Sequence, residues 1–417
     1  MARLSKLVPM KVPDLNMTFL AVAAMVLFSP APATAADSKL AQRGCETLAS
    51  RVDEVPGDGP VFLRSYDHAD GAGPAAEPAL NGAFTYDNAL AAIALVACWQ
   101  AGRARRIGEA LALAATEDRD GPRGRLRNAY RPGAQKERPI PPMGWWSEAH
   151  KQWLEDPYQT GTATGNVAWA ALALLTLSEA TNDPRYRASA RHLADWIVAN
   201  TKDTAGAGGF TGGIFADGTR AQVLTWKSTE HAADLVALFA WLGMREEHRH
   251  ARAFLEAIWD KKAGYFPTGA GTDGITVNRA TSGLDAQLWP LLLPDAPMHW
   301  QSALGYAERA HGVPGGFDFN DDRDGLWLEG TAQAALVYRY LGRADEAKRA
   351  LSEVAKHVSS GGYVWATREA QITTGLAIGP DSVTDDFRYY RLPHLGATAW
   401  AVLAAVGWNP FTGKRAR

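Results

Sequence analysis

The sequence predicts an all-α fold in which buried and amphipathic helices alternate around one ring, an (α/α)6 toroid. Nearly all-apolar segments recur along the chain, each follows a short polar signature, and most precede a segment that is apolar on one face only. A helix that is apolar all round is buried, whereas a one-sided helix covers a core. A plain solenoid is the alternative, but solenoid repeats have a fixed short period and these segments do not.

The helices are expected in the following order. Residues 38–52 form an amphipathic helix. This helix can serve as the outer partner of the last inner helix, which would close the ring with all inner N-termini on one face. The inner helices with their partners are 89–100 with 103–116, 167–177 with 186–197, 232–242 with 254–259, 282–290 with 300–310, 332–341 with 347–358, and 399–406.

The N-terminus has the layout of a Sec-type signal peptide. Arg3 and Lys6 precede an apolar run over residues 17–28, and a small-residue site ends at Ala35. We expect cleavage near Ala35 or Ala36, so that residues 1–36 are the signal and 37–417 form one toroidal domain, periplasmic or secreted. The apolar run is too short to span a bilayer comfortably, so we expect no stable membrane insertion.

Composition excludes several other classes. The formal net charge of the 417 residues is -2, which gives no basic field for nucleic acid. Cys45 and Cys98 could form one disulfide or remain two buried thiols. Residues 320–325 resemble half of a calcium loop, but Thr331 stands where the bidentate Glu belongs. With no phosphate loop, dinucleotide fingerprint or zinc spacing either, we expect neither metal nor cofactor.

The openings of the inner helices carry Tyr86-Asp-Asn-Ala, Thr164-Gly-Asn-Val-Ala-Trp, Ser228-Thr-Glu-His, Trp327-Leu-Glu-Gly-Thr and Gly396-Ala-Thr-Ala-Trp. With the helix alternation, these motifs make the chain resemble the six-hairpin glycosidase superfamily from about Tyr86 to Trp408, without assigning one family. The resemblance implies a carbohydrate-active enzyme whose cleft lies at the N-terminal ends of the inner helices, where their acids would face substrate.

Glycoside hydrolysis needs one carboxyl group that protonates the leaving oxygen and one that acts as base or nucleophile. Singly, each acid at a helix start can be a capping residue. We predict Glu230 as the general acid, because Trp226 and the apolar helix would desolvate it and raise its pKa. The partner is Asp285 or Glu329, and Asp87 is either catalytic or a ligand of sugar hydroxyls.

Candidate substrate contacts lie in three places: at an inner helix start, in the loop before the last helix, and on the aromatic connection 118–159. On that connection, exposed rings could stack on sugar faces. The alternative for the tryptophans of the connection is that they pack it onto the ring. The candidates are Tyr86, Asn88, Asn166, Trp145, Trp146, Trp226, His231, Gln287, Trp327, Asp386 and His394.

The sequence therefore favours an exported glycoside hydrolase acting on an oligo- or polysaccharide through two carboxyl groups. Two alternatives stay open. A polysaccharide lyase or sugar epimerase would need a base such as His231, His394 or Tyr86. A non-catalytic glycan-binding protein of exopolysaccharide assembly would use the same aromatic residues without chemistry. The sugar, the linkage and the oligomeric state stay open as well.

Overall fold

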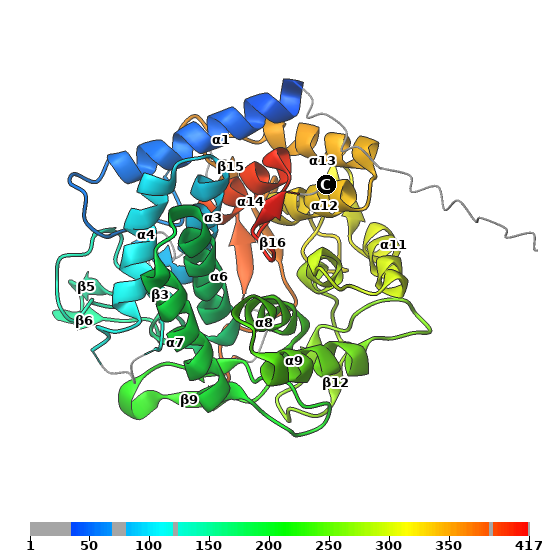
Figure 1. Cartoon of the computed structure of the whole chain (residues 1–417), viewed down its shortest axis with the longest axis horizontal. Helices are drawn as coiled ribbons and strands as arrows, with labels where there is room; N and C mark the ends of the chain where they lie inside the picture. The colour runs from blue at the N-terminus through cyan, green and yellow to red at the C-terminus, as the bar shows by residue number, and fades with distance from the viewer. Residues whose placement is uncertain (1–34, 69–80, 120–123, 383–386, 416–417) are drawn as a thin grey trace, which may run out of the picture.

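The computed structural model describes residues 35–68, 81–119, 124–382 and 387–415. Within these residues the helices form two concentric layers around a common axis (Figure 1). The expected signal segment up to residue 34, and Asp385 and Asp386, lie outside them. The all-α toroid predicted from the sequence is confirmed.

The inner layer is a closed ring. Each inner helix packs on the next, and the last returns to the first. The fourth is short, because Pro290 has no N–H to continue an α-helix and the chain continues as a 3-10 helix, η2 (Trp289–Leu292). The inner helices are α3 (Thr85–Ala97), α6 (Thr164–Thr181), α8 (Thr229–Leu242), α10 (Leu284–Leu288), α12 (Leu328–Tyr340) and α14 (Leu395–Val406).

The outer layer contains the amphipathic helices. The N-terminal helix α1 packs on α14 and α13, so it fills the outer place that the last inner helix lacks, as the sequence predicted. The outer helices are α1 (Ala35–Asp53), α4 (Ala101–Ala114), α7 (Pro184–Thr201), α9 (Arg245–Ile258), α11 (Ser302–Ala310), which follows the 3-10 helix η3 (Met298–Gln301), and α13 (Ala344–Lys356).

Most inner helices begin earlier than their apolar segments, so the polar signatures form first helical turns. In α8, Ser228 is the N-cap, as predicted. Its Oγ accepts hydrogen bonds from the backbone N–H groups of Glu230 at 3.1 Å and His231 at 3.4 Å. The acidic side chains therefore project from the ends of the helices on one face of the ring.

Short strands precede four inner helices, and the sequence did not predict them. Two-residue strands are too short to show an alternating pattern. They fix the N-terminal ends of these helices against their connections. The antiparallel pairs are β2 (Ala83–Phe84) with β3 (Ala129–Tyr130), β7 (Thr162–Ala163) with β8 (Gly213–Phe215), β10 (Lys227–Ser228) with β11 (Gly269–Ala270), and β18 (Pro393–His394) with β15 (Val364–Trp365).

The remaining elements lie mostly in the connections. They are β1 (Val61–Phe62), β4 (Gly133–Ala134), β5 (Trp145–Ser147), β6 (Gln152–Leu154), α5 (Pro157–Thr160), η1 (Gly218–Arg220), β9 (Gln222–Leu224), β12 (Val277–Asn278), β13 (Gly312–Val313), β14 (Gly316–Phe317), β16 (Gln371–Thr373), β17 (Arg388–Tyr390), β19 (Trp408–Asn409) and β20 (Lys414–Arg415).

An aromatic cluster fills the centre of the ring. Trp169 lies with its ring centroid 5.2 Å from that of Trp289 and 5.7 Å from that of Trp400, and Phe411 packs on the first two. Trp169 and Trp400 each stand five residues after the first residue of their helix, about 7 Å along the axis. The aromatic cluster therefore lies about one and a half helical turns from the N-terminal face, inside the ring.

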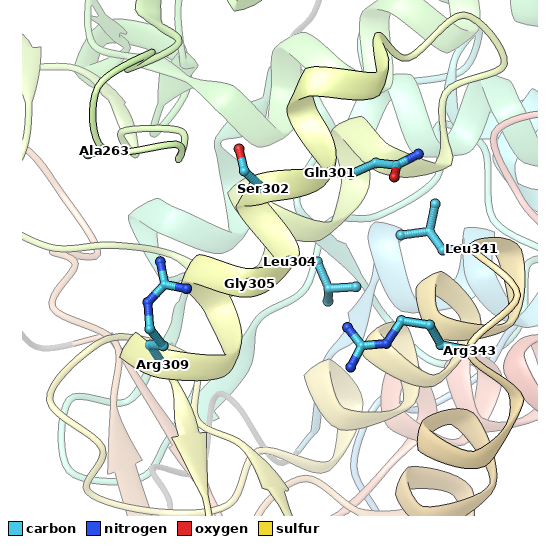
Figure 2. A pocket seen from close by; sticks show the side chains of 8 residues that line it. All are labelled: Ala263, Gln301, Ser302, Leu304, Gly305, Arg309, Leu341 and Arg343. Carbon is cyan, nitrogen blue, oxygen red and sulfur yellow. The ribbon is translucent and has the colours of Figure 1, made fainter.

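A surface pocket lies on the outer wall, between α11 and the connection from α12 to α13 (Figure 2). Gln301, Ser302, Leu304 and Arg309 line it from η3 and α11, and Arg343 lines it from the start of α13. Arg343 is paired with Glu308 at 2.8 Å and Glu346 at 3.0 Å. This pocket contains none of the acids at the inner helix starts.

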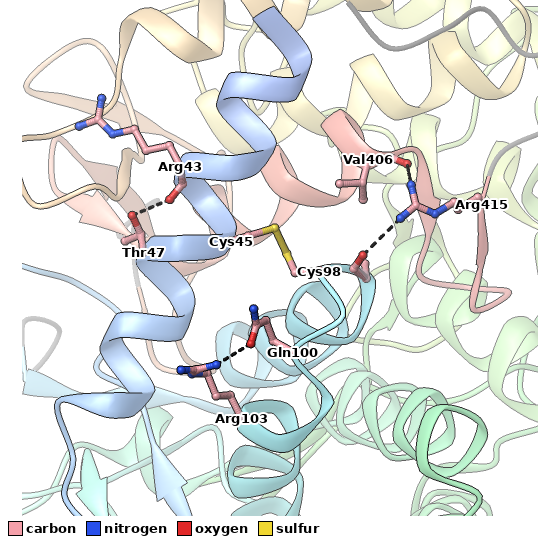
Figure 3. The surroundings of a disulfide bond; sticks show 9 residues. Arg43, Cys45, Thr47, Cys98, Gln100, Arg103, Val406 and Arg415 are labelled. Atoms are coloured by element: carbon pink, nitrogen blue, oxygen red, sulfur yellow. Dashed lines mark hydrogen bonds between the residues drawn. A yellow bond between two sulfur atoms is a disulfide. The ribbon is translucent and has the colours of Figure 1, made fainter. Parts of the chain in front are cut away.

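One disulfide joins the two layers. Cys45 in α1 is bonded to Cys98 at the end of α3, with their Cα atoms 5.8 Å apart (Figure 3). The bond ties the outer helix that closes the ring to the first inner helix. This answers the question that the sequence left open between a disulfide and two thiols. In the described part of the chain, no helix is long and apolar enough to cross a membrane.

Candidate active site

Five carboxyl groups gather where the inner helices begin. We call them the acidic centre: Asp87 on α3, Glu230 and Asp234 on α8, Asp285 on α10 and Glu329 on α12. Burial raises the pKa of Asp285 and of Glu329. Charge on Glu230, Glu329 and Asp234 adds to the shift of Asp285, and charge on Asp87 adds to that of Glu329. The four acids that the sequence placed at inner helix starts therefore lie within electrostatic reach of one another.

Glu329 has two polar side chains beside its carboxyl group, Tyr86 and His394. The hydroxyl of Tyr86 donates a hydrogen bond to its Oε1 at 2.8 Å, and Nδ1 of His394 lies 3.4 Å from its Oε2. Burial raises the pKa of Glu329 to about 7, while His394 and Tyr86 favour the carboxylate and Asp87 opposes it. Two groups are thus arranged to stabilise a charge on this side chain.

His394 connects Glu329 to Asp87. Its Nε2 lies 3.3 Å from Oδ2 of Asp87, and its ring is stacked on Tyr66 with centroids 4.5 Å apart. Burial disfavours the imidazolium, but Asp87 and Glu329 outweigh it and raise the pKa of His394. His394 is also the N-cap of α14, since its Nδ1 accepts a hydrogen bond from the backbone N–H of Ala397 at 3.3 Å.

Glu230 has no comparable support, and only an interaction with Gln333 favours the charged form of Asp285. Burial alone raises the pKa of Glu230 to about 7, although part of its surface stays exposed. Asp285 is buried, and its Oδ1 has no hydrogen-bond partner among the described residues. Burial, Glu230 and Glu329 raise its pKa well above the usual range. Burial and the neighbouring acids therefore favour the protonated form of Asp285, and Glu230 titrates near neutrality.

The sequence reasoning missed Asp234, which follows Glu230 by one turn of α8. It is fully buried, and burial and Glu230 raise its pKa well above the usual range despite an interaction with Trp169. A signal was present, because Asp234 is the one acid inside the apolar segment 232–242. Next to it, burial lowers the pKa of His231 to about 4, so that imidazole is neutral.

Two tyrosines were also missed. Burial together with Asp87 and Glu329 raises the pKa of Tyr66, and burial and Glu329 raise that of Tyr389. Both tyrosines therefore belong to the surroundings of the acidic centre. They lie in irregular connections or two- to three-residue strands, where no periodicity marks a position.

The sequence analysis proposed Asn88 and Gln287 as substrate contacts, and the structure corrects this. Both side chains are fully buried. The amide of Asn88 bonds to the backbone N–H and carbonyl of Leu63, and that of Gln287 bonds to the same two groups of Phe266. Their amides satisfy backbone groups of the connections and therefore have a structural role.

The predicted tryptophan platforms also need correction. Trp327 is fully buried, with ring centroids 4.9 Å from Phe319 and 5.3 Å from Tyr389. Trp145 and Trp146 lie on the β5–β6 hairpin at the lateral edge of the ring, away from its centre (Figure 1). Trp327 is therefore too buried to stack on a sugar, and Trp145 and Trp146 lie away from the acidic centre.

Other predicted contacts keep a suitable place. Trp226 is partly buried 5.5 Å from His231, measured between ring centroids. Asn166 is in the first turn of α6, where its Nδ2 donates to Oδ1 of Asn128 at 2.8 Å. Both remain predictions, and Asp386 lies outside the described residues.

One group of carboxylates has ligand-like spacing for a cation. Oxygen atoms of Asp318, Asp322 and Asp324 lie within 4.8 Å of one another, in the segment whose sequence resembles half of a calcium loop. Each already accepts hydrogen bonds: Asp318 from two backbone amides, Asp322 from Asn320 and Thr373, and Asp324 from the backbone of Thr373. These bonds explain the cluster as the frame of a turn.

No protein-family model matches the chain, and no curated protein matches it. A glycosidase variant is 13% identical with a TM-score of 0.58, over 88% of this chain and 96% of that one. A sugar epimerase from a ruminal bacterium is 11% identical with a TM-score of 0.58, over 88% and 98%. A possible member of the GH105 family from Salmonella enterica serovar Paratyphi A is 15% identical with a TM-score of 0.53, over 93% and 98%.

Each of these similarities covers at least 88% of this chain and at least 96% of the other structure. The chain therefore shares the toroidal fold of these structures. At these identities the similarities do not single out a family.

Proposed function

We propose that this protein is a carbohydrate-active enzyme, and more specifically a glycoside hydrolase that cleaves an oligo- or polysaccharide through two carboxyl groups of the acidic centre. The observation that carries the proposal is the difference between Glu230 and Glu329. Burial alone acts on Glu230, whereas Tyr86 and His394 favour the charged form of Glu329. Burial raises the pKa of both acids to about 7, so the difference lies in their neighbours. The hydrogen bond from Tyr86 and the imidazole of His394 favour Glu329 as the charged member of the pair that a hydrolase needs.

The roles follow from these environments. Glu230, protonated up to about neutral pH, donates its proton to the oxygen of the leaving sugar. Glu329, as the carboxylate, acts as base toward water or as nucleophile. The protonated form of Asp285 is favoured, and its Oδ1 has no hydrogen-bond partner among the described residues, so it is suited to hydrogen-bond a sugar hydroxyl between the two.

We also propose that the enzyme works in the periplasm or outside the cell. The N-terminal sequence has the layout of a signal peptide. The Cys45–Cys98 disulfide supports the same location, because such bonds persist in oxidising compartments.

A sugar epimerase is the second candidate. His394 and Tyr66 lie beside the carboxyl groups and could take part in proton transfer, and one of the similar structures is a sugar epimerase. Burial raises the pKa of Tyr66, which keeps its hydroxyl protonated and makes it a poor base. This argues against Tyr66 as the base of an epimerase and leaves His394 as the candidate for that role.

The test is a screen of the purified protein against bacterial and plant glycans, scored for new reducing ends. Glu230→Gln should abolish them. Glu246→Gln is the matched control, because Glu246 is in the first turn of the next helix but pairs with Lys202 at the exposed surface. An ultraviolet-absorbing product would identify a lyase, and a change of sugar configuration without cleavage an epimerase. Glycan binding with no product at all would identify a binding protein.

A further inference from the structure

Three inner helices meet around Gly396, in the first turn of α14. A Cβ atom at this position would lie 2.6 Å from Oδ1 of Asp87, 2.9 Å from Cε1 of His394 and 3.0 Å from Oε2 of Glu329. The three side chains come from α3, from the residue that caps α14 and from α12. Only a residue without a side chain allows them to approach one another this closely.

The imidazole in the middle can transmit charge. Its Nδ1 accepts the N–H of Ala397, so in the neutral ring the proton is on Nε2, which faces Asp87. A second proton would go to Nδ1, where it would replace the hydrogen bond from Ala397 and face Oε2 of Glu329 at 3.4 Å. The same ring thus faces one carboxyl with each nitrogen.

We propose that Asp87 is a positioning residue that acts on Glu329 mainly through His394, and that His394 and Glu329 share one proton. Asp87 then need not touch the sugar. It orients the imidazole, favours its charged form and so keeps Glu329 ionised. The inference rests on the proposed function for the catalytic task of Glu329, but its geometry does not.

The two routes from Asp87 to Glu329 have opposite signs. Acting directly, the Asp87 charge repels a second negative charge and raises the pKa of Glu329. Acting through His394, it maintains a positive charge that lowers this pKa, and His394 has the larger effect on Glu329. Among the described residues, the other titratable groups facing the imidazole are two tyrosines. Tyr66 is stacked on it, and Tyr389 lies at 6.3 Å between ring centroids.

The experiment measures both partners without any substrate. The purified protein is labelled at glutamate carboxyl carbons and histidine ring nitrogens, and nuclear magnetic resonance follows Glu329 and His394 from pH 4 to pH 9. The signals are assigned with Glu329→Gln and His394→Asn. Asparagine keeps the capping role at residue 394, because it is among the preferred N-caps. His231, whose pKa burial lowers to about 4, is the internal control.

Asp87→Asn should lower the pKa of His394 by about 1–3 units, the usual effect of losing a nearby opposite charge. In the same variant the pKa of Glu329 should rise. In a His394→Asn background, Asp87→Asn should instead lower the pKa of Glu329, because only the direct repulsion is left. A fall of the Glu329 pKa in both backgrounds, or an unchanged His394, would overturn the proposal.

Activity gives an independent readout. If the protein hydrolyses a glycan, Asp87→Asn should lower kcat with little change in KM and move the acidic limb of the pH profile upward, because Glu329 ionises later. A large rise in KM with an unmoved profile would mean that Asp87 binds substrate, against the proposal. Failure to find any glycan product would count against the hydrolase but would not change the resonance result.

Discussion

The hydroxyl of Tyr86 donates a hydrogen bond to Oε1 of Glu329 at 2.8 Å, and it accepts one from the indole N–H of Trp400 at 2.8 Å. Two hydrogen bonds in series therefore connect helices α3, α12 and α14, and they join the acidic centre to the aromatic cluster. The bond from Tyr86 to Glu329 therefore links the first and fifth inner helices at the proposed active site.

Tyr86→Phe removes a donor that favours the charged form of Glu329, so the pKa of Glu329 should rise. A hydrogen bond to a charged group contributes about 1.5–3 kcal/mol, equivalent to about 1–2 pH units. The acidic limb of kcat/KM should move upward by that amount. Tyr389→Phe is the control, because Tyr389 packs near Glu329 without a hydrogen bond to it in the described structure. Equal shifts in both variants would speak against the Tyr86 contact.

Glu329→Gln should stabilise the fold at alkaline pH. The native pKa of Glu329, about 7, is above its ordinary value of 4.5, so the folded state binds more protons than the unfolded state between these values. Stability from this group is present below pH 4.5 and is lost as the pH rises to 7, by about 3 kcal/mol. Urea unfolding at pH 5 and pH 8 measures the difference. A variant that loses stability equally at both would contradict the assignment.

Gly396→Ala should nearly abolish activity while the ring still folds, because its methyl group would contact Asp87, His394 and Glu329 at once. Gly102→Ala in α4 is the control, since a Cβ there meets no other atom within 4 Å. It should be neutral or stabilise by up to about 1 kcal/mol. Kinetics and thermal melting of both variants test this pair. Normal kcat/KM in Gly396→Ala would show that the three side chains need no such close approach.

Replacing Cys45 and Cys98 together by serine should lower the free energy of unfolding by about 4 kcal/mol, because the bond closes a loop with a sequence separation of 53. A reductant should have the same effect on the natural protein and none on the double variant. Chemical unfolding with and without reductant measures both. Equal stability in all four cases would mean that ring closure does not depend on the bond.

Much of the ring could be predicted from the sequence, because an all-apolar helix beside a one-sided helix is a strong periodic signal. The role of residues 38–52 as the closing outer helix followed from the same pattern. Helix starts were less accurate: α12 begins at Leu328, where we had started the apolar segment at residue 332. The polar first turn interrupts the apolar run, although it belongs to the helix.

The acidic centre was predicted in part. Glu230, Asp285 and Glu329 were found because a toroid brings equivalent positions of different helices to one face. Asn88 and Gln287 stand at equivalent positions, but their amides turn to backbone groups of the connections, which no helix pattern reveals. Tyr66 and Tyr389 reach the site from connections whose path only the tertiary structure determines.

The hydrolysis rates of Glu230→Gln and Glu329→Gln, on a glycan that the natural protein cleaves, test the central claim most directly. Both variants should fold and lose at least about 100-fold in kcat, the usual contribution of a general acid or base. Glu246→Gln should keep its rate. Full activity in both of the first two variants would contradict a two-carboxylate site at the inner helix starts.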